Sequence, residues 1–151
     1  MARTAHAALA CFLIVGLAAC SGEASARELA QEACEGVGDS SGTPAYQGSN
    51  GRVWASRLLS SIDDEALPAL KEYADLAAQA AARDDRYRTL SLTASELLAD
   101  TDAMRAPLGH LATNDVEMWQ PEQWQAYQAL GEDVLNGIDA MRAECRIVRA
   151  E

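Results

Sequence analysis

The chain has 151 residues, which is enough for one domain with one hydrophobic core, and its formal net charge is −11. Nucleic acids require a basic protein face, so an acidic chain of this kind is not expected to bind them. It should also be repelled by anionic lipid head groups, so its own charge will not hold it on a membrane. An enzyme, a ligand-binding domain and an interaction or structural module all remain possible.

A short apolar run, Ala7–Ala19, follows a segment whose one basic residue is Arg3. The run is too short to span a bilayer as a stable helix but has the length of a signal-peptide core. It ends in Leu17-Ala18-Ala19-Cys20, which resembles the lipobox of bacterial lipoproteins. That resemblance implies that residues 1–19 are a cleaved signal peptide and that Cys20 becomes the lipid-modified first residue.

The resemblance also implies where the protein resides. A chain acylated on Cys20, with diacylglycerol and palmitate, is anchored in the cell membrane or outer membrane and lies on its extracytoplasmic face. Residues 20–25 would then be a short tether, whose last five residues span at most about 18 Å. The alternative is an ordinary secretory signal in which the cysteine occurs by chance. Removal of Arg3 leaves 11 basic and 23 acidic residues, a net charge of −12.

The four cysteines have different expected fates. Cys11 leaves with the signal peptide and Cys20 carries the lipid, which leaves Cys34 and Cys145 in a compartment where disulfides persist. We therefore expect a Cys34–Cys145 disulfide; two independent buried thiols or a metal pair are the alternatives. One mature histidine, His110, completes only a poor zinc set, so no metal or other cofactor is expected.

Helical periodicity begins at about Ala24 and continues to Glu35, where glycines end it. The segment from Gly38 to Gly51 is rich in Gly, Ser and Asn and is predicted to be a loop. A second helix starts at Arg52, and a break is expected near Asp63–Pro68, because proline disfavours helix at the preceding residue.

Two further helices precede the last one. The apolar stripe of the next helix, Leu67–Ala81, is mostly alanine, so a neighbouring helix can approach it closely. Asp84-Asp85 mark a turn and a new helix start. The following helix is predicted to end at Pro107–Gly109, and its apolar stripe consists of Tyr87, Leu90, Ala94, Leu97, Thr101 and Met104.

The last helix opens at Pro121, where a missing N–H costs nothing. Its apolar residues alternate by three and four as a sustained seam: Trp124, Tyr127, Gly131, Val134, Ile138, Met141, Cys145 and Val148. Gly131 is expected to let a partner helix come near. Long amphipathic helices joined by short turns predict an all-α, up-and-down bundle of about four helices over residues 26–151.

Recognisable catalytic patterns are weak. Gly38-Asp39-Ser40-Ser41-Gly42 matches G-x-S-x-G, but no strand precedes it and His110 lies on a different predicted loop. His110 is expected to satisfy a helix end or lie in water rather than bind a metal. The paired acids lack the spacing of a calcium loop. We therefore expect a protein that is not an enzyme.

A tryptophan-containing segment at one bundle end is the candidate contact site. Asp115, Met118, Trp119 and Trp124 could form an aromatic-lined pocket or a partner-binding patch, although Trp119 and Trp124 could also simply staple the helix start. We expect a non-catalytic interaction or structural module, with an envelope protein as a possible partner. The alternative is a small-ligand binder, which an internal apolar pocket with convergent polar groups would favour.

Overall fold

The computed structural model describes residues 23–37, 51–113 and 120–151, and every regular element in these ranges is a helix. The elements are α1 (Ala26–Glu35), α2 (Gly51–Ser61), a π-helical turn (Ile62–Ala66), α3 (Leu67–Arg83), a 3-10 turn (Asp85–Tyr87), α4 (Arg88–Ala103), α5 (Arg105–Thr113) and α6 (Pro121–Ala150). The predicted all-α bundle is confirmed.

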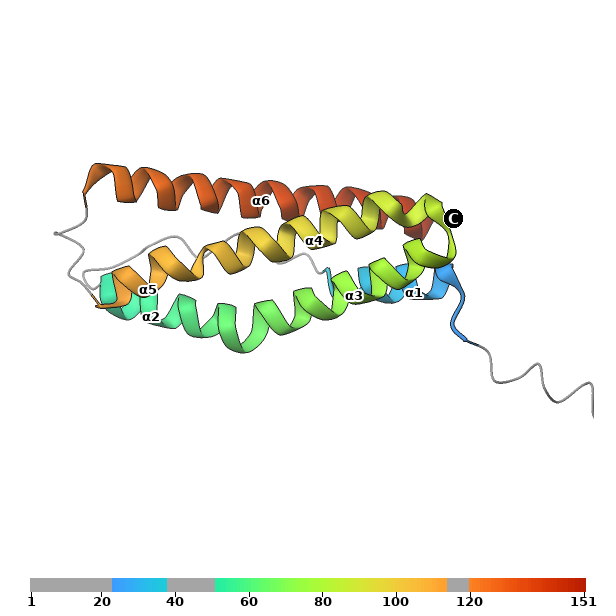
Figure 1. Cartoon of the computed structure of the whole chain (residues 1–151), viewed down its shortest axis with the longest axis horizontal. Helices are drawn as coiled ribbons and strands as arrows, with labels where there is room; N and C mark the ends of the chain where they lie inside the picture. Colours follow the sequence, from blue (N-terminus) through green and yellow to red (C-terminus); the bar gives the residue numbers. More distant parts are fainter. Residues whose placement is uncertain (1–22, 38–50, 114–119) are drawn as a thin grey trace, which may run out of the picture.

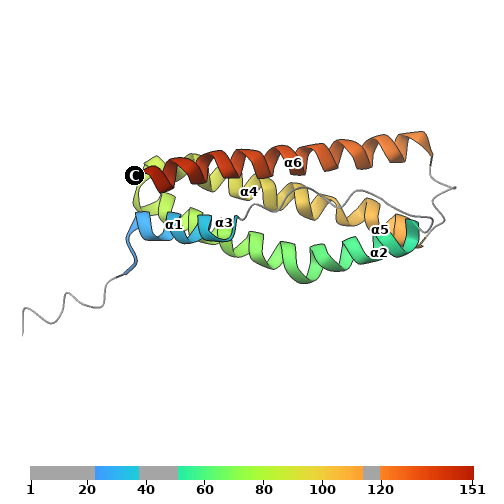
Figure 2. The ribbon, with the colours of Figure 1, turned by 180° about the vertical axis from the view of Figure 1, so that it is seen from behind.

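Three long rods lie along one another in Figure 1: α2 continued by α3, α4 continued by α5, and α6. α3 packs on α4 and α4 packs on α6, while α2 packs on α5. α1 is a short fourth helix, packed on α3 and α6 at the end where the C-terminus lies (Figure 1, Figure 2). A cross-section through α1 therefore cuts four helices of the described structure, whereas a cross-section beyond the end of α1 cuts three.

Small side chains explain how closely α1 and α3 approach. Ala30 and Ala33 of α1 are fully buried, and so are Ala77 and Ala80 of α3. α1 begins with a capping box, in which the Glu28 amide donates to the Ser25 hydroxyl and the Ser25 amide donates to the Glu28 carboxylate. α3 packs on both α1 and α4, and its buried alanines agree with the predicted close approach of a neighbouring helix.

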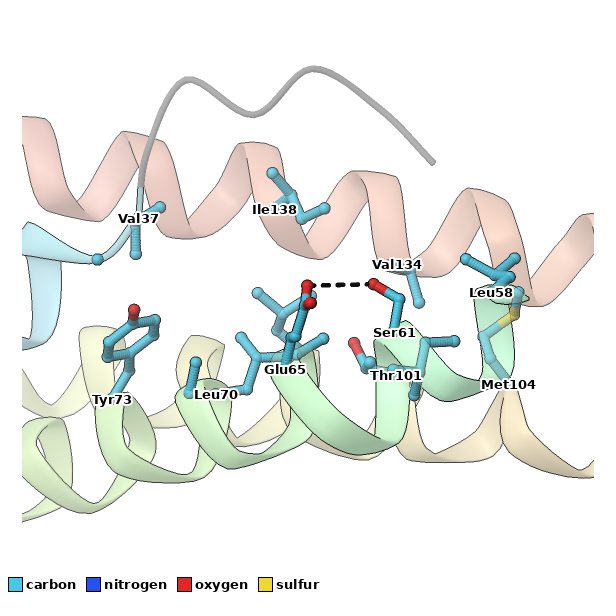
Figure 3. Close-up of a pocket in the computed structure, with 15 residues that line it drawn as sticks. Val37, Leu58, Ser61, Glu65, Leu70, Tyr73, Thr101, Met104, Val134 and Ile138 are labelled. Atoms are coloured by element: carbon cyan, nitrogen blue, oxygen red, sulfur yellow. Dashed lines mark hydrogen bonds between the residues drawn. The ribbon is translucent and has the colours of Figure 1, made fainter. Parts of the chain in front are cut away.

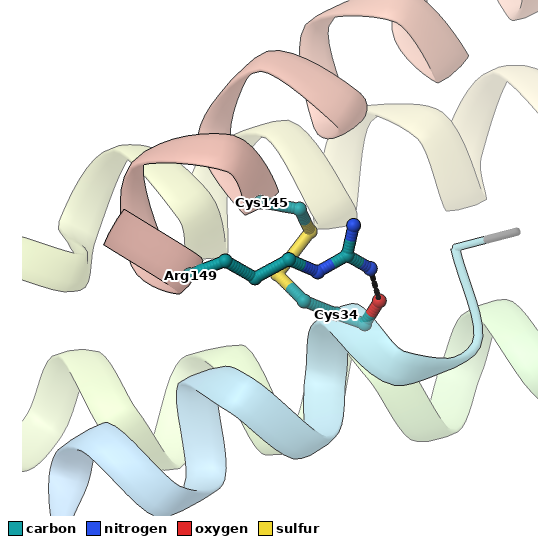
Figure 4. Close-up of a disulfide and its surroundings, with 3 residues drawn as sticks. All are labelled: Cys34, Cys145 and Arg149. Carbon is teal, nitrogen blue, oxygen red and sulfur yellow. Dashed lines mark hydrogen bonds between the residues drawn. A yellow bond between two sulfur atoms is a disulfide. The ribbon is translucent and has the colours of Figure 1, made fainter. Parts of the chain in front are cut away.

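A disulfide joins Cys34 of α1 to Cys145 of α6 (Figure 4). The two Sγ atoms are 2.10 Å apart, the Cα atoms are 5.4 Å apart, and both side chains are buried. Arg149, one turn beyond Cys145, donates a hydrogen bond of 2.7 Å from Nη2 to the carbonyl oxygen of Cys34. The predicted pairing is confirmed, and it links α1 to α6 across a sequence separation of 111 residues.

The break predicted near Asp63–Pro68 is instead a π-helical turn within one continuous rod. The Leu67 amide donates to the carbonyl of Ile62, five residues back. Pro68 accounts for the wider turn, because it has no N–H to donate and its ring would clash with the carbonyl of Asp64 in a regular α-helix. α2 and α3 consequently form a bent rod that is convex on the side away from α6 (Figure 1).

The helix with the Tyr87–Met104 stripe was predicted to end at Pro107–Gly109, and this prediction is also wrong. α4 ends at Ala103, and both of these residues lie inside α5, which continues to Thr113. Pro107 is the third residue of α5. Its missing N–H costs little there, because the first four amides of a helix have no intrahelical acceptor.

The predicted seam of α6 faces the core most fully in the second half of the helix. Val134, Met141, Cys145 and Val148 are buried, whereas Trp124, Tyr127 and Ile138 are partly buried. In Figure 1, α6 and α5 diverge toward the end of the bundle that holds α2. The seam residues Trp124 and Tyr127, in the first half of α6, are accordingly less buried than those near its C-terminal end.

Gly137, rather than Gly131, is where α6 approaches α4 closely. A Cβ atom at Gly137 would lie 3.1 Å from Cδ1 and 3.6 Å from Cα of Leu97. A Cβ atom at Gly131 would meet no atom of the described residues within 4 Å. The expectation for Gly131 is therefore wrong, because this residue lies in the half of α6 that diverges from the neighbouring rods.

Tyr87, in the turn before α4, is buried and has the hydrogen-bond partner that a buried tyrosine requires. Its hydroxyl donates to Oε2 of Glu151 at 2.7 Å, which ties the start of α4 to the end of α6. Burial, and then this hydrogen bond, raise the pKa of Tyr87.

No helix in the described ranges is both long and apolar enough to cross a bilayer.

Candidate functional site

Most of the candidate contact residues lie outside the described part of the chain. Cys20, Asp115, Met118 and Trp119 fall there, as does the Gly38–Gly42 pattern. Trp124 is described: it is partly buried in the first turn of α6 and packs edge-to-face on Tyr127, with ring centroids 6.1 Å apart. Trp124 is thus part of the packing between helices.

The aromatic packing around Trp124 extends to α2. The Tyr127 ring packs edge-to-face on Trp54, with centroids 5.8 Å apart, and burial raises the pKa of Tyr127. Together, Trp54, Trp124 and Tyr127 join α2 to α6 at the end of the bundle where these rods diverge. The described part of Trp124's surroundings is thus an aromatic contact between these two helices.

His110 is exposed on the last turn of α5 and faces Gln123 of α6, with 3.4 Å between His110 Nε2 and Gln123 Nε2. The placement of His110 on a loop is therefore wrong, because α5 continues past it to Thr113, whereas its exposed position near a helix end agrees with the expectation. Within residues 23–37, 51–113 and 120–151, no three His, Cys, Asp or Glu side chains gather in a way that could hold a metal ion.

A cavity of about 570 Å³ lies between the bent α2–α3 rod, α4 and α6, just beyond the end of α1 (Figure 3). This volume is within the range of small-molecule sites in proteins. Most of its lining is aliphatic. The lining residues are Gly36, Val37, Leu58, Ser61, Ile62, Glu65, Ala66, Ala69, Leu70, Tyr73, Leu97, Thr101, Met104, Val134 and Ile138.

Three features of the chain create this cavity. α1 stops at Glu35, so the fourth helix is missing from that level of the bundle. The π-helical turn bends the α2–α3 rod away from α6. Ala66 and Ala69 then present only methyl groups to the space that the bend opens. The cavity is therefore a consequence of helix length, backbone geometry and side-chain size acting together.

Gly36 and Tyr73 form the wall of the cavity beside α1. A Cβ atom at Gly36 would lie within 2 Å of the Tyr73 hydroxyl oxygen, so only glycine lets the ring lie where it does. The Tyr73 side chain is partly exposed, and in Figure 3 its hydroxyl points toward the end of α1 near Val37. This contact sets one end of the cavity.

Thr101 contributes the one buried polar side chain of the described cavity wall. Its side chain is on the core face of α4, the residue is 5% exposed, and its Oγ1 has no hydrogen-bond partner among the described residues. Figure 3 shows this oxygen on the cavity side of α4. A buried hydroxyl without a partner costs about 1–3 kcal/mol, so a partner supplied from the cavity would be favourable.

Ser61 and Glu65 place polar groups on the exposed side of the cavity. Both residues lie on the bend of the α2–α3 rod and are exposed, and the Ser61 hydroxyl donates to Glu65 Oε2 at 3.4 Å (Figure 3). Glu65 and Tyr73 are the ionisable side chains in the part of the cavity lining that the structure describes. The cavity thus combines an apolar body, one buried hydroxyl and one carboxylate at its solvent side.

Two further hollows of the described residues are more open to solvent than this cavity. One lies over α3 and α4 and is lined by Lys71, Asp102 and Arg105. Arg105 pairs with Asp63 at 2.7 Å and with Asp102 at 3.2 Å, and these carboxylates, Asp102 first, raise the pKa of Arg105. Lys71 pairs instead with Asp75 at 3.0 Å, so both basic side chains of this open hollow already have carboxylate partners.

The cavity was not predicted from the sequence, although the sequence contained one indication of it. Thr101 is the polar member of the apolar stripe predicted for α4, and all six residues of that stripe are buried. A hydroxyl on a core face is a position where a partner is required.

Comparisons with protein-family models, with curated protein sequences and with solved structures gave no match.

Proposed function

We propose that this protein is a membrane-anchored bacterial lipoprotein whose helical domain binds a small apolar molecule in the cavity beside Thr101. The observation that carries the proposal is a cavity of about 570 Å³ with aliphatic walls and a buried hydroxyl that has no partner among the described residues. Apolar walls with a few convergent polar groups are the usual composition of a small-molecule site. This cavity supports the ligand-binding alternative over a purely structural module.

The ligand that suits this site has an apolar body and a neutral polar atom within it. The body replaces water against Leu58, Leu70, Leu97 and Ile138, which gains about 25 cal/mol for each Å² of apolar surface buried. The polar atom pairs with the Thr101 hydroxyl, which can donate or accept a hydrogen bond.

Binding rather than catalysis is proposed because of the groups that line the cavity. Within the described lining, Glu65 is the one carboxylate and Tyr73 is the one other ionisable group. The lining residues that the structure describes include no histidine, lysine or cysteine, so they do not assemble the usual pairing of a nucleophile with a base.

Binding can be tested on the mature chain, residues 20–151, with Cys20 replaced by serine so that no detergent is needed. This chain contains every described core residue, from Ala24 to Val148. N-phenyl-1-naphthylamine, an uncharged apolar fluorophore, should bind saturably with one site per chain. Absence of saturable binding would contradict the proposal.

A matched pair of α3 variants locates the binding. Ala69→Leu puts a larger side chain into the cavity and should weaken fluorophore binding at least about tenfold, since steric overlap removes most of the burial of the ligand. Ala78→Leu makes the same change at an exposed position of α3 and should leave binding unaltered. Equal binding by both variants would place the fluorophore elsewhere.

The membrane anchor is proposed on the lipobox resemblance of residues 17–20, and the buried Cys34–Cys145 disulfide supports an oxidising, extracytoplasmic location. The intact mass of the membrane-bound protein should correspond to an acylated chain starting at Cys20. Cys20→Ser should abolish acylation, because the modification requires the thiol. A soluble wild-type product cut at another position would refute the anchor.

A further inference from the structure

One carboxylate gives the solvent side of the cavity a negative charge. Among the described residues that line it, Glu65 is the one with a charged side chain, and no arginine or lysine is among them. Glu65 is exposed, so its carboxylate remains hydrated at the solvent side while the apolar wall lies behind it. A charged ligand group can therefore meet Glu65 without being taken out of water, which avoids the large cost of burying a charge.

The surrounding charges do not reverse this sign. Asp64 is exposed next to Glu65 and adds negative charge, while Asp63 is paired with Arg105. Arg57 shares a separate, shallow hollow with Asp64 and Glu65 but does not line the cavity. Across the cavity on α6, the nearest basic residue in sequence to Ile138 is Arg142, whose Nη1 lies 3.2 Å from Oδ1 of Asp139.

We infer that the cavity selects an apolar amine: a molecule with an aliphatic body and a cationic ammonium group that lies beside Glu65. This inference rests on the proposed ligand-binding function and specifies its ligand class. The aliphatic body occupies the wall between α2–α3 and α6, and the ammonium group stays at the solvent side. An anionic amphiphile with the same body, such as a fatty acid, is repelled by Glu65 and by the acidic domain as a whole.

The expected discrimination is moderate because Glu65 is exposed. Two unit charges about 4 Å apart interact by about 1 kcal/mol in water, and exposed pairs contribute up to about that amount. This corresponds to about threefold to fivefold tighter binding of an ammonium ligand than of an uncharged one, and about tenfold or more over a carboxylate. The preference should shrink at high salt, because mobile ions screen exposed charges.

The test uses decylamine, decanol and decanoate, which share one alkyl chain and differ in head group. Each is used below its aggregation concentration to displace N-phenyl-1-naphthylamine from the mature chain, residues 20–151 with Cys20→Ser. Decylamine should displace it best and decanoate least. Glu65→Gln should weaken decylamine about threefold and leave decanol unchanged, since only the ammonium ligand loses a charge partner.

Asp64→Asn is the matched control, because it lowers the net negative charge by the same unit on a residue that does not line the cavity. An equal effect of Asp64→Asn and Glu65→Gln would mean a general attraction of amines to the acidic surface and would overturn the inference. Decylamine binding that survives in Ala69→Leu would overturn it too. Equal binding of all three compounds would refute charge selection while leaving the proposed function intact. No binding of the fluorophore or of any of the three would refute both.

Discussion

Replacing Thr101 by valine should make the ligand-free protein more stable. Valine has nearly the same shape and helix propensity as threonine, so the exchange removes the hydroxyl and little else. In the folded protein this hydroxyl is buried, the residue is 5% exposed, and Oγ1 has no partner among the described residues. In the unfolded chain it is fully hydrated, so folding carries a desolvation cost that valine lacks.

The magnitude follows from the position of Thr101 on the cavity wall. An unpartnered buried hydroxyl costs about 1–3 kcal/mol, and the lower end applies here because a cavity of about 570 Å³ has room for a water molecule. We therefore expect the free energy of unfolding to rise by about 1 kcal/mol. For a chain of this size, that corresponds to an increase in Tm of about 3 °C.

Urea titration followed by circular dichroism measures the change, with Thr93→Val as the control. Thr93 is also on α4 but is only partly buried, and its exchange should alter stability by less than about 0.5 kcal/mol. Thr101→Val should at the same time weaken binding of ligands that have a polar atom within the body. A loss of stability of about 1 kcal/mol or more in Thr101→Val would show that the hydroxyl already has a partner in the folded protein and would refute the reasoning.

Three further changes test other parts of the bundle. Replacing Cys34 and Cys145 by alanine should lower the free energy of unfolding by up to about 5 kcal/mol, since the bond closes a loop of 111 residues, and an unchanged urea midpoint would count against this role. Gly131→Ala should stabilise α6 by roughly 0.5–1 kcal/mol in thermal unfolding because no atom of the described residues lies near the new methyl group. Gly137→Leu should destabilise the protein through overlap with α4, and the reverse order would disprove the assigned contact. The raised pKa of Tyr87 means that its stabilising contribution is complete below pH 10, its unfolded pKa, and is lost as the pH rises through its folded pKa. The wild type should therefore lose more stability than Tyr87→Phe in alkaline urea titrations, and parallel curves would contradict this.

Sequence periodicity correctly predicted those features of the helices that depend on the side-chain pattern of a single helix. The alternation on α6 predicted a core face, and the alanines of α3 predicted a close neighbour. The Cys34–Cys145 bond followed from the number of cysteines that remain after the predicted processing. These features depend on local patterns or on counting, which a single sequence contains.

The features that sequence reasoning missed depend on relations between distant segments. Pro68 was interpreted as the end of a helix, whereas a wider turn accommodates it without interrupting the rod. Gly131 and Gly137 cannot be told apart without knowing where α4 lies. The cavity depends on the length of α1 relative to the rods beside it, which no stripe on one helix records. Thr101 was placed on the correct face, but its lack of a partner is visible only in three dimensions.

The disulfide also changes the topology through which the chain carries force. Residues 34–145 form a closed covalent ring, and the residues before Cys34 are a tail attached to it. Tension on that tail passes through the sulfur atoms directly into α6 as well as along the backbone. A single proteolytic cut anywhere between Val37 and Gly51 would therefore leave both pieces covalently joined, and the bundle would stay attached to whatever holds the N-terminal tail. Reduction of the bond would separate the pieces, so attachment after such a cut depends on the redox state of the surroundings.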